Sequence, residues 1–397
     1  MSWQAWTFIF CTALIAYAWA GYAMLAWVLA RVFPRPVRRC TAAPTAISIV
    51  VAAYNEVANI ERRIHELLEL LARFDPESEL IVVSDGSTDG TEVVARRMKH
   101  PQLRVIEQPR NMGKATALNT GVAAASNHII VFADARQRWA PDAILCMLGN
   151  FADQTVGAVS GNMVLENHDG TLAGVGLYWK LEKFIRHNES RRFSTVQVSG
   201  SISAVRKGLY ESIPPGTILD DMYWPLGVAM RGYRVIHEPR AYAYDRLPEK
   251  SRDEFRRKVR TLSGNLQLVM LRPTLLLPLR NPSWFALVNH KLLRLVVPWA
   301  MLGALFACTV SAELLLREAL LAQLLLYGVG VLALVWRPVG RNRVANAIAS
   351  LMMLNAAAAV AWYVYAAGRS GTSWKKVRYR VDGQEMPAGA KSVGSIG

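Results

Sequence analysis

Residues 46–56 read AISIVVAAYNE, residues 79–90 read ELIVVSDGSTDG, and residues 128–136 read HIIVFADAR. Each segment is a short, strongly apolar run that ends on polar or acidic residues, a pattern typical of strands buried on both faces. Residues 57–71, which follow the first run, place apolar side chains at helical spacing. These side chains are Ile60, Ile64, Leu67, Leu68 and Leu71. Strands that alternate with helices predict an α/β fold with a mostly parallel central sheet.

Acidic side chains lie at or just beyond the ends of these predicted strands. Glu56, Asp85 and Asp134 occupy such positions after the first, second and third runs. Ligands of open α/β sheets bind at the carboxyl ends of the strands. Carboxylates gathered there are suited to a divalent cation, Mg²⁺ or Mn²⁺, that accompanies a polyphosphate.

The composition favours a membrane protein. The 397 residues are 52% hydrophobic, include 12 tryptophans and carry a formal net charge of +16. The arginines cluster beside apolar segments, so this charge favours contact with an anionic lipid bilayer over binding of nucleic acid. The four cysteines, at positions 11, 40, 146 and 308, have no paired spacing, which argues against a disulfide framework and a cysteine zinc site.

Residues 6–30 form an apolar, uncharged segment that exceeds the roughly 20 residues needed to cross a bilayer. Arg31, Arg35, Arg38 and Arg39 follow at once, so the positive-inside rule places the next domain in the cytosol.

Three more spans are predicted at residues 292–310, 320–336 and 344–367. The basic tail at residues 375–380 conflicts with a simple count of four crossings. Either one segment is re-entrant or the tail is translocated despite its charge, and the sequence leaves both open.

Residues 251–270 place apolar side chains at helical spacing between basic ones. This predicts an amphipathic helix that lies on the membrane surface, on the preceding domain, or on both. The chain is therefore expected to comprise an N-terminal span with a basic linker, a cytosolic domain, interfacial helices, a membrane bundle and a basic, disordered tail. The corresponding ranges are 1–40, 46–245, 246–290, 291–368 and 369–397.

The segment DGSTDG, residues 85–90, follows a predicted strand and opens a helix. Alone, it is equally typical of an ordinary strand–turn–helix connection. In nucleotide-binding folds an acid at the place of Asp85 accepts hydrogen bonds from the nucleoside. Gly113 and Lys114 open the next predicted helix, whose N-terminus attracts phosphate, although such a pair taken alone more often marks a solvated lysine.

Acidic residues of two further motifs are suited to chemistry. Asp134 closes a strand, where a carboxylate can hold a cation that bridges the oxygens of a diphosphate. Asp220 and Asp221 precede a predicted helix that Gly232 ends. Adjacent acids at a helix start are often only caps, but they also serve as general bases where the fold brings them to a site.

Together these motifs resemble those of glycosyltransferase family 2. Within it, they are similar to bacterial inner-membrane enzymes that make polysaccharides, such as the chitin, hyaluronan, poly-N-acetylglucosamine and cellulose synthases. The segments that carry the resemblance are AAYNE, DGSTDG, NMGKATALN, FADAR, VSGSISAVRK and DDMYWPLGVAMRGYR, in that order. The resemblance implies a GT-A-like nucleotide-sugar domain over most of residues 46–267.

The resemblance also implies roles for individual residues. Asp221, Asp220 and Arg260 would be catalytic, with Asp221 as the general base, and Asp134 would bind the metal. The nucleotide-sugar would contact Ala53, Tyr54, Glu56, Asp85, Gly113, Lys114, Asp134 and Arg257. The acceptor would contact Gly200, Ser201 and Asp220.

The sequence departs from the family pattern at two places. The last acid of the D-x-D motif is replaced by Arg136, which removes one metal ligand and offers a contact to phosphate or acceptor instead. In processive synthases a Q-x-x-R-W motif follows, and here the aligned residues are 257–261. Arg260 keeps the place of the arginine, but Thr261 stands where a tryptophan stacks on the acceptor sugar. Processive synthesis is therefore in question unless another aromatic, such as Trp139, Trp179 or Trp224, supplies the platform.

The sequence thus predicts a multi-pass enzyme of the bacterial inner membrane. It would transfer a sugar, with inversion, from a nucleotide-sugar, most simply a UDP-sugar, to a growing glycan or lipid-linked acceptor. Polysaccharide-export subunits are further candidate partners. A polyprenyl-phosphate glycosyltransferase shares the early motifs and stays an alternative. So does a non-catalytic nucleotide-binding partner of a secretion complex, against which the retention of Asp85, Asp134 and Asp221 argues.

Overall fold

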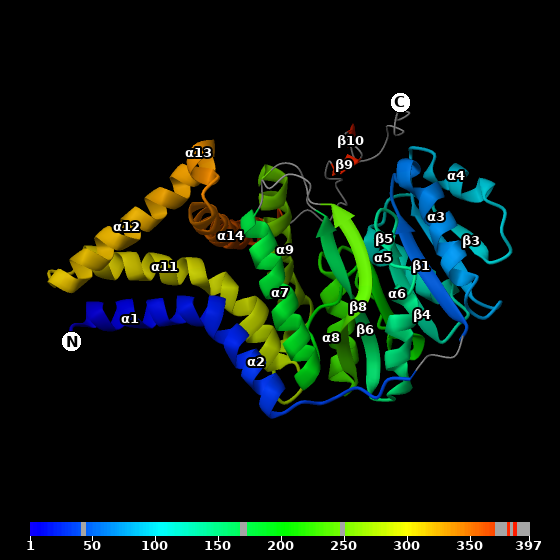
Figure 1. The fold of residues 1–397 in the computed structure, drawn as a ribbon, viewed down its shortest axis with the longest axis horizontal. Coiled ribbons are helices and arrows are strands. Elements are labelled where there is room, and N and C mark those ends of the chain that lie inside the picture. The colour runs from blue at the N-terminus through cyan, green and yellow to red at the C-terminus, as the bar shows by residue number, and fades with distance from the viewer. Residues whose placement is uncertain (41–44, 167–172, 247–250, 370–378, 382–383, 387–397) are drawn as a thin grey trace.

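The computed structural model describes residues 1–40, 45–166, 173–246, 251–369, 379–381 and 384–386. It joins an α/β domain to a set of long helices that extend away from it (Figure 1). One eight-stranded sheet has the order β3-β2-β1-β4-β7-β6-β8-β5. Its strands are β1 (Ile47–Ala53), β2 (Glu79–Asp85), β3 (Leu103–Gln108), β4 (Ile129–Asp134), β5 (Arg138–Trp139), β6 (Val156–Glu166), β7 (Ile202–Arg206) and β8 (Arg234–Arg246).

The predicted mostly parallel sheet is confirmed. Strands β3, β2, β1 and β4 run parallel, and β6 runs parallel to β8. Strand β7 is antiparallel to both β4 and β6, and β5 is antiparallel to β8. The helices of this domain are α3 (Val57–Leu71), α4 (Thr91–Arg97), α5 (Lys114–Ala124), α6 (Ala143–Leu148), α7 (Ala173–Arg192) and α8 (Asp220–Met230).

Two apolar cores cover the two faces of the sheet, which explains why the central strands lack polar alternation. Alternate residues of β1 enter each core: Ile49 packs with Leu67 of α3, whereas Val50 packs with Leu118 of α5. The register aligns the carboxyl ends of β1, β2 and β4, because Ala53 of β1 lies opposite Ser84 of β2 and Ala52 lies opposite Asp134 of β4. The residues that follow β1, β2 and β4 are therefore brought to one edge.

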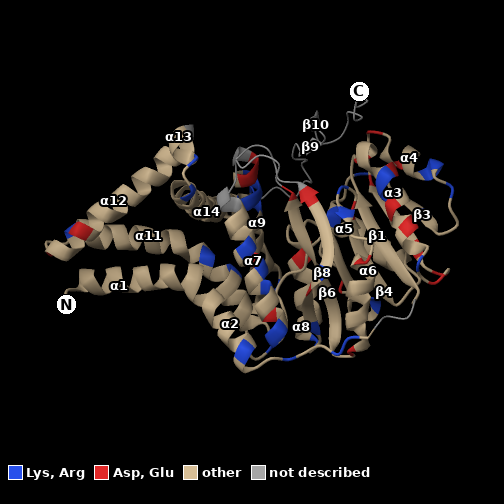
Figure 2. Ribbon diagram, viewed as in Figure 1, with Lys and Arg blue, Asp and Glu red and all other residues tan. Residues whose placement is uncertain are grey.

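In the part of the chain that the structure describes, four helical runs are long and apolar enough to cross a membrane, as predicted. They are Trp3–Val32, Trp284–Thr309, Leu314–Val335 and Arg343–Ala366. The first comprises α1 (Trp3–Ala16), the π-helical turn Tyr17–Gly21 and α2 (Tyr22–Val32), and the second ends in α11 (Leu293–Thr309). The third and fourth are α12 (Leu314–Val335) and α14 (Arg343–Ala366), linked through α13 (Arg337–Gly340). Charged residues are sparse on α1, α11 and α12 and frequent on α7 and in the α/β domain (Figure 2).

The second run begins earlier than the sequence indicated. Helical structure starts at Trp284 and continues through residues 287–292 into α11, so the expected boundary between residues 290 and 291 falls inside a helix. Of the tail from residue 369, the structure describes Arg369 and a small ladder of Tyr379–Val381 and Gln384–Met386. The rest of the tail, where disorder was expected, lies outside the described residues.

The predicted amphipathic helix is α9 (Ser251–Leu271), and it packs against both neighbours. On one side it lies against α14. On the other, Gln267 accepts a hydrogen bond of 2.8 Å from the backbone N–H of Ile218 and donates one of 2.9 Å to the carbonyl of Gly216. Helix α9 therefore joins α14, one of the candidate membrane-spanning helices, to the loop that precedes α8.

Candidate active site

Asp85, the last residue of β2, fixes the loop that leads into α5. Its carboxylate is fully buried and accepts hydrogen bonds from the backbone N–H groups of Met112, at 2.7 Å, and Gly113, at 2.9 Å. Burial raises the pKa of Asp85 above its ordinary value, although these two N–H groups oppose the shift. Gly113 has a φ of 91°, which favours glycine. Asp85 and Gly113 thus set the position of the first turn of α5.

Lys114, the first residue of α5, joins two of the predicted site motifs. Its Nζ donates a 2.8 Å hydrogen bond to Oδ1 of Asp134 at the end of β4, and it lies 3.9 Å from Oδ2 of Asp220. Burial alone would lower the pKa of Lys114, but the carboxylates of Asp134, Asp220 and Asp221 raise it above its ordinary value. Lys114 is therefore a fixed positive charge at the sheet edge.

Asp220 and Asp221 open α8 and have different surroundings. Burial, with the charges of Asp221 and Asp134, raises the pKa of Asp220 to about 6, while Lys114 and Arg260 oppose this shift. Oδ2 of Asp221 accepts a 2.7 Å hydrogen bond from Nε2 of Gln197. The two adjacent acids therefore have separate partners, one facing the lysine and one facing Gln197.

Gln197 is a site residue that sequence reasoning missed. Its Oε1 accepts a 3.1 Å hydrogen bond from Nη2 of Arg186 on α7, which turns its amide N–H groups toward Asp221. Only the position of Gln197 directly before the acceptor-side motif VSGSISAVRK hinted at this role. Asp221 is consequently held by a chain of contacts that reaches α7.

Gly200 and Ser201 lie next to these charges, just before β7. A Cβ placed on Gly200 would be 3.4 Å from Nζ of Lys114 and 3.7 Å from Cβ of Asp221. Ser201 is buried, and its carbonyl accepts a 3.1 Å hydrogen bond from Nε1 of Trp139. The structure therefore brings Gly200 into the site and gives Ser201 a contact within the core.

The segment after β1 is tied to the DGSTDG loop. Ala53 is fully buried at the end of β1, and Tyr54 is half-buried beside it. The backbone N–H of Glu56 donates a 2.7 Å hydrogen bond to Thr91, and its carboxylate accepts one of 2.8 Å from Asn59. The contact with Thr91, the residue that follows DGSTDG, ties the segment after β1 to the start of α4.

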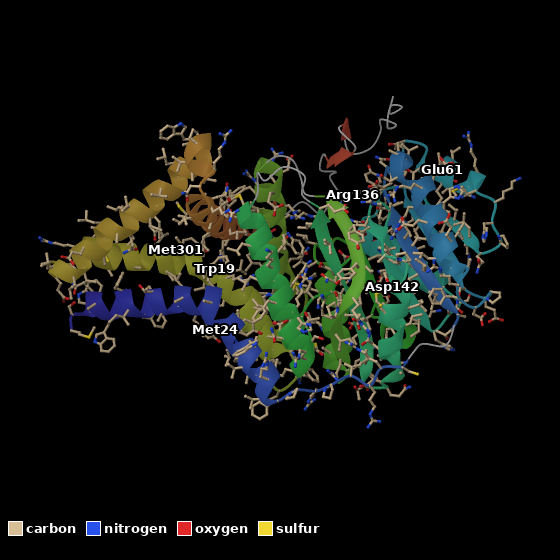
Figure 3. All side chains as sticks on the ribbon, in the orientation of Figure 1. Trp19, Met24, Glu61, Arg136, Asp142 and Met301 are labelled. Atoms are coloured by element: carbon tan, nitrogen blue, oxygen red, sulfur yellow. The ribbon has the colours of Figure 1, made fainter. Side chains whose placement is uncertain are left out.

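The three predicted arginines lie in different environments. Arg136, at the edge of the sheet where the strands end (Figure 3), binds the carboxylate of Asp245 with N–O distances of 3.2 and 3.0 Å. Arg257 pairs with Glu254 one turn earlier on α9, at 2.7 Å. Arg260 is exposed and close enough to Asp220 to lower the pKa of that carboxyl. Arg260 therefore faces the acidic cluster, whereas Arg136 and Arg257 have carboxylate partners of their own.

Two of the aromatic platforms considered from the sequence are wrong. Trp139 is 6% exposed and Trp224 is 2% exposed, so both rings belong to the core. Trp179, on α7, is half-buried, and its ring centroid is 5.9 Å from Nζ of Lys258.

Among the described residues, no group of three or more His, Cys, Asp or Glu side chains is arranged to hold a metal by itself. Asp134 lies at the predicted strand end, with Lys114 bonded to one of its two oxygens. Because Mg²⁺ is commonly held by one or two carboxylates together with substrate phosphates, Asp134 fits a cation that arrives with a nucleotide.

The chain matches known proteins in sequence. Residues 48–213 match the family described as Glycosyl transferase family 2. The chain is 27% identical over 231 residues to a poly-beta-1,6-N-acetyl-D-glucosamine synthase of Staphylococcus aureus (strain COL), covering 56% of this chain and 55% of that protein. A synthase of the same name from Staphylococcus epidermidis is 26% identical over the same length. The chain therefore spans about half the length of the curated relatives it matches.

A solved structure shares the fold. The mannosyltransferase PcManGT from Pyrobaculum calidifontis, in complex with GDP-Man and Mn²⁺, aligns with a TM-score of 0.68 at 23% identity. The match covers 91% of this chain and 99% of that protein, so it includes long helices as well as the α/β domain. The family resemblance is thus confirmed over residues 48–213, which match glycosyl transferase family 2, and the fold is GT-A-like.

Proposed function

We propose that this chain is a membrane-anchored inverting glycosyltransferase that uses a nucleotide-sugar donor. One observation carries the proposal: Lys114 joins Asp134, from the D-x-D strand, to Asp220, from the acceptor-side helix. A donor diphosphate and an acceptor hydroxyl need these two elements on opposite sides of one reacting carbon. Their meeting at one sheet edge supports a catalytic site over a nucleotide-binding role alone.

The proposed roles follow from charge and position. Asp221 deprotonates the acceptor hydroxyl, whose oxygen attacks the anomeric carbon while the bond to the nucleoside diphosphate breaks. Gln197 orients the carboxylate of Asp221 through their 2.7 Å hydrogen bond. Lys114 and the exposed Arg260 supply fixed positive charge where the diphosphate departs. Residues 54–56 form the nucleoside end of the site, and the buried Asp85 sets the turn beside them through its bonds to Met112 and Gly113.

A divalent cation is part of this proposal. Mg²⁺ or Mn²⁺ held at Asp134 would neutralise negative charge on the leaving diphosphate. Arg136, which stands at the place of the missing acid, binds Asp245 and thereby ties the end of β4 to β8.

The sugar is the least constrained part of the proposal. The curated relatives are named as synthases of a poly-N-acetylglucosamine, and PcManGT was solved with GDP-Man. These names support testing UDP-N-acetylglucosamine first and GDP-mannose second. We also propose that the product is part of an envelope or extracellular polysaccharide. Export subunits would take part in making it.

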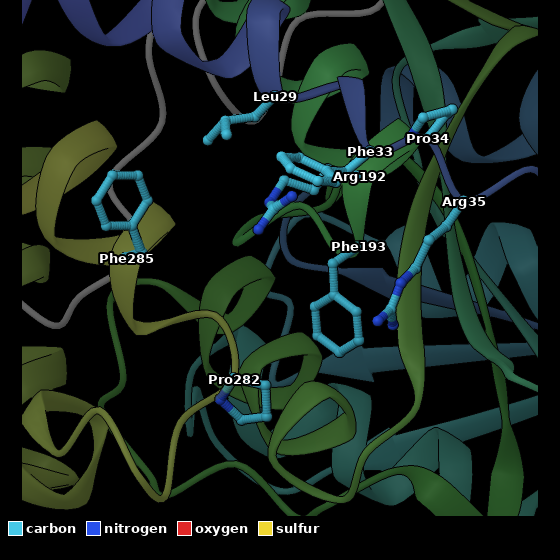
Figure 4. Close-up of a pocket in the computed structure, with 8 residues that line it drawn as sticks. All are labelled: Leu29, Phe33, Pro34, Arg35, Arg192, Phe193, Pro282 and Phe285. Atoms are coloured by element: carbon cyan, nitrogen blue, oxygen red, sulfur yellow. The ribbon is translucent and has the colours of Figure 1, made fainter. Parts of the chain in front are cut away.

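The proposed location is the cytosolic face of a bacterial inner membrane. A cavity of about 890 Å³ lies where α2 ends, lined by apolar side chains and two arginines (Figure 4). Within it the guanidinium carbon of Arg35 lies 5.6 Å from the ring centroid of Phe193, and that of Arg192 lies 5.4 Å from the centroid of Phe33. Arginines beside aromatic rings at the end of an apolar span are typical of a cytosolic membrane boundary.

Nucleotide release tests the function directly. The purified chain in detergent is incubated with a panel of UDP- and GDP-sugars plus a lipid extract, and the nucleoside diphosphate formed is measured. We expect release from one donor, lost in Asp221→Asn and retained in the exposed control Glu61→Gln. If the chain binds a donor but releases no nucleoside diphosphate with any acceptor tested, it is a nucleotide-binding protein and not a glycosyltransferase.

A further inference from the structure

A small cavity lies between the glycosyltransferase domain and the membrane helices. Its volume is about 50 Å³, and its walls come from the acceptor side of the domain, from α9 and from three membrane runs. The lining residues used below are Trp19, Gln197, Lys258, Thr261, Lys291 and Arg294. Gln197 is also the hydrogen-bond donor to Asp221, so the cavity begins directly behind the proposed base.

Positive charge dominates the wall of this cavity. None of its lining residues is acidic, whereas Lys258, Lys291 and Arg294 all reach it. Behind the wall, Glu182 of α7 is 2.9 Å from Lys291, 3.1 Å from His290 and bonded to Arg294. Glu182 therefore has two cationic partners, Lys291 and Arg294, and shares His290 with Glu189, which lies 2.9 Å from the other ring nitrogen.

Lys258 has a similarly shared partner. Its Nζ is 3.7 Å from Glu254, which also pairs with Arg257 at 2.7 Å. Burial, together with the charges of Arg257 and Lys291, lowers the pKa of Lys258 to about 8, while Glu254 and Glu182 oppose the shift. An added negative charge in the cavity would relieve this excess of buried positive charge.

Some N–H groups of the lining residues also have no hydrogen-bond acceptor among the described residues. Nε and Nη2 of Arg294, and Nε1 of Trp19, are buried without a hydrogen-bond partner in the part of the chain that the structure describes. Arg294 is 6% exposed, and its guanidinium carbon lies 5.4 Å from the Trp19 ring centroid. Stacking stabilises the charge of Arg294, but it gives the N–H groups no acceptor, and buried donors without acceptors are costly.

A compact anion with several acceptor oxygens would fit both the positive charge and the unpaired N–H groups of this cavity. A phosphate group has this chemistry and suits both the guanidinium and the ammonium groups. A neutral glycan strand would offer hydroxyl groups but no charge. Thr261 lines the same cavity, at the position where processive synthases resembling this chain place the tryptophan that stacks on a sugar.

We propose that this cavity binds the phosphate of a lipid-linked acceptor. The inference rests on the proposed function, because Gln197 joins the cavity to Asp221. The lipid chain leaves the cavity toward the membrane helices, whose α14 residues form part of its wall. The acceptor is therefore a sugar carried on a lipid phosphate or diphosphate. Its sugar supplies the hydroxyl that Asp221 deprotonates, and its phosphate is the group that the cavity holds.

Equilibrium binding tests the cavity without turnover. The full-length chain in detergent is titrated with a radiolabelled short-chain prenyl phosphate, with the matching prenyl alcohol and inorganic phosphate as competitors. Trp19→Phe removes an N–H that has no partner, and Lys258→Gln removes one charge. Trp27→Phe and Lys180→Gln are matched controls at exposed positions.

We expect saturable binding that each cavity variant weakens about tenfold, the effect of losing one charged hydrogen bond, and that neither control changes. Competition by a prenyl diphosphate-linked sugar that exceeds competition by the prenyl phosphate would identify the sugar carrier as the acceptor. Equal binding by wild type and both cavity variants would overturn the proposal. So would equal competition by inorganic phosphate or by phosphatidylglycerol, since the site would then hold free anion or bulk lipid.

The same preparations separate this inference from the proposed function. Prenyl phosphate binding that depends on Trp19 and Lys258, without nucleotide release from any donor, would support the cavity and contradict the catalytic proposal. Nucleotide release onto a soluble glycan, with no prenyl phosphate binding, would do the opposite.

Discussion

The ammonium group of Lys114 lies 2.8 Å from the carboxylate of Asp134, although α5 and β4 are separate elements of the sheet edge. This contact forms because β4 pairs with β1 and Asp85 fixes the turn before α5. It places the positive charge of the GK motif on the acid of the D-x-D motif. In the absence of donor, each group therefore stabilises the charge that the other carries.

Replacing Lys114 with methionine should lower turnover by about 10²–10³-fold, the range for removing one preorganised electrostatic contact. It should also lower the melting temperature, because Asp134, Asp220 and Asp221 would repel one another. Adding Asp134→Asn to Lys114→Met should recover part of the melting temperature but no activity. Lys99→Met, at an exposed site, is the control. Unchanged nucleotide release in Lys114→Met would remove the lysine from the mechanism.

Asp221→Asn should lower turnover by about 10²–10⁴-fold, as expected for a general base, while donor binding persists. Gln197→Leu should lower turnover less and leave the KM for donor unchanged, because Gln197 acts by orienting Asp221. Initial rates over a range of donor concentrations measure both the turnover number and the KM for donor. Wild-type turnover in Asp221→Asn would exclude this residue as the base.

The pKa of Asp220 gives a prediction for stability. Because the folded-state value is raised to about 6, the folded protein binds more protons than the unfolded chain between about pH 4 and pH 6. Stability contributed by this group is therefore lost as the pH rises through that window. Asp220→Asn should raise the melting temperature at pH 7, and the gain should vanish near pH 4. Thermal unfolding across this range is the measurement, and a gain that grows toward low pH would contradict the sign.

Much of this site could be predicted from sequence, because it lies in segments whose patterns are local. The apolar runs before Asp85 and Asp134 gave both strands, and the register of parallel strands then brought their ends together. Arg257 shows what family position alone leaves out: the resemblance assigns it to the donor, and the structure adds an ion pair with Glu254, three residues earlier on α9. The i, i+3 spacing was visible in the sequence.

The cavity behind Gln197 could not be predicted from local sequence patterns. Trp19, Gln197, Lys258 and Arg294 lie far apart in the chain, and no local period links them. Their meeting depends on how α9 packs between the domain and the membrane helices, which is set by tertiary contacts. The buried position of Trp139 and Trp224 was hidden for the same reason.

Chelation should abolish activity if a cation accompanies the donor. Exhaustive treatment with EDTA should stop nucleotide release, and Mg²⁺ or Mn²⁺ should restore it. Asp134→Ala should weaken donor binding and raise the cation concentration needed for half-maximal activity. Full activity after chelation would show that the reaction needs no divalent cation. Lys114 and Arg260 would then be the groups that neutralise the leaving diphosphate.

The number of sugars added in each encounter depends on how firmly residue 261 can hold an acceptor sugar. Thr261 offers a methyl and a hydroxyl group where processive relatives carry tryptophan, and its hydroxyl already donates a 3.0 Å hydrogen bond to the carbonyl of Arg257. A sugar at this position therefore lacks the large contact area that an aromatic face supplies. Trp139 and Trp224 cannot substitute, since both are buried in the core.

We therefore expect a short product or a single transfer when the chain acts alone. Labelled donor is supplied at limiting enzyme, and products are sized early in the reaction. Thr261→Trp should not lengthen the product, because the new ring would fill a cavity that we assign to phosphate, and it should instead weaken prenyl phosphate binding. Long polymer beside untouched acceptor, made by the wild-type chain alone, would contradict this and favour a processive synthase.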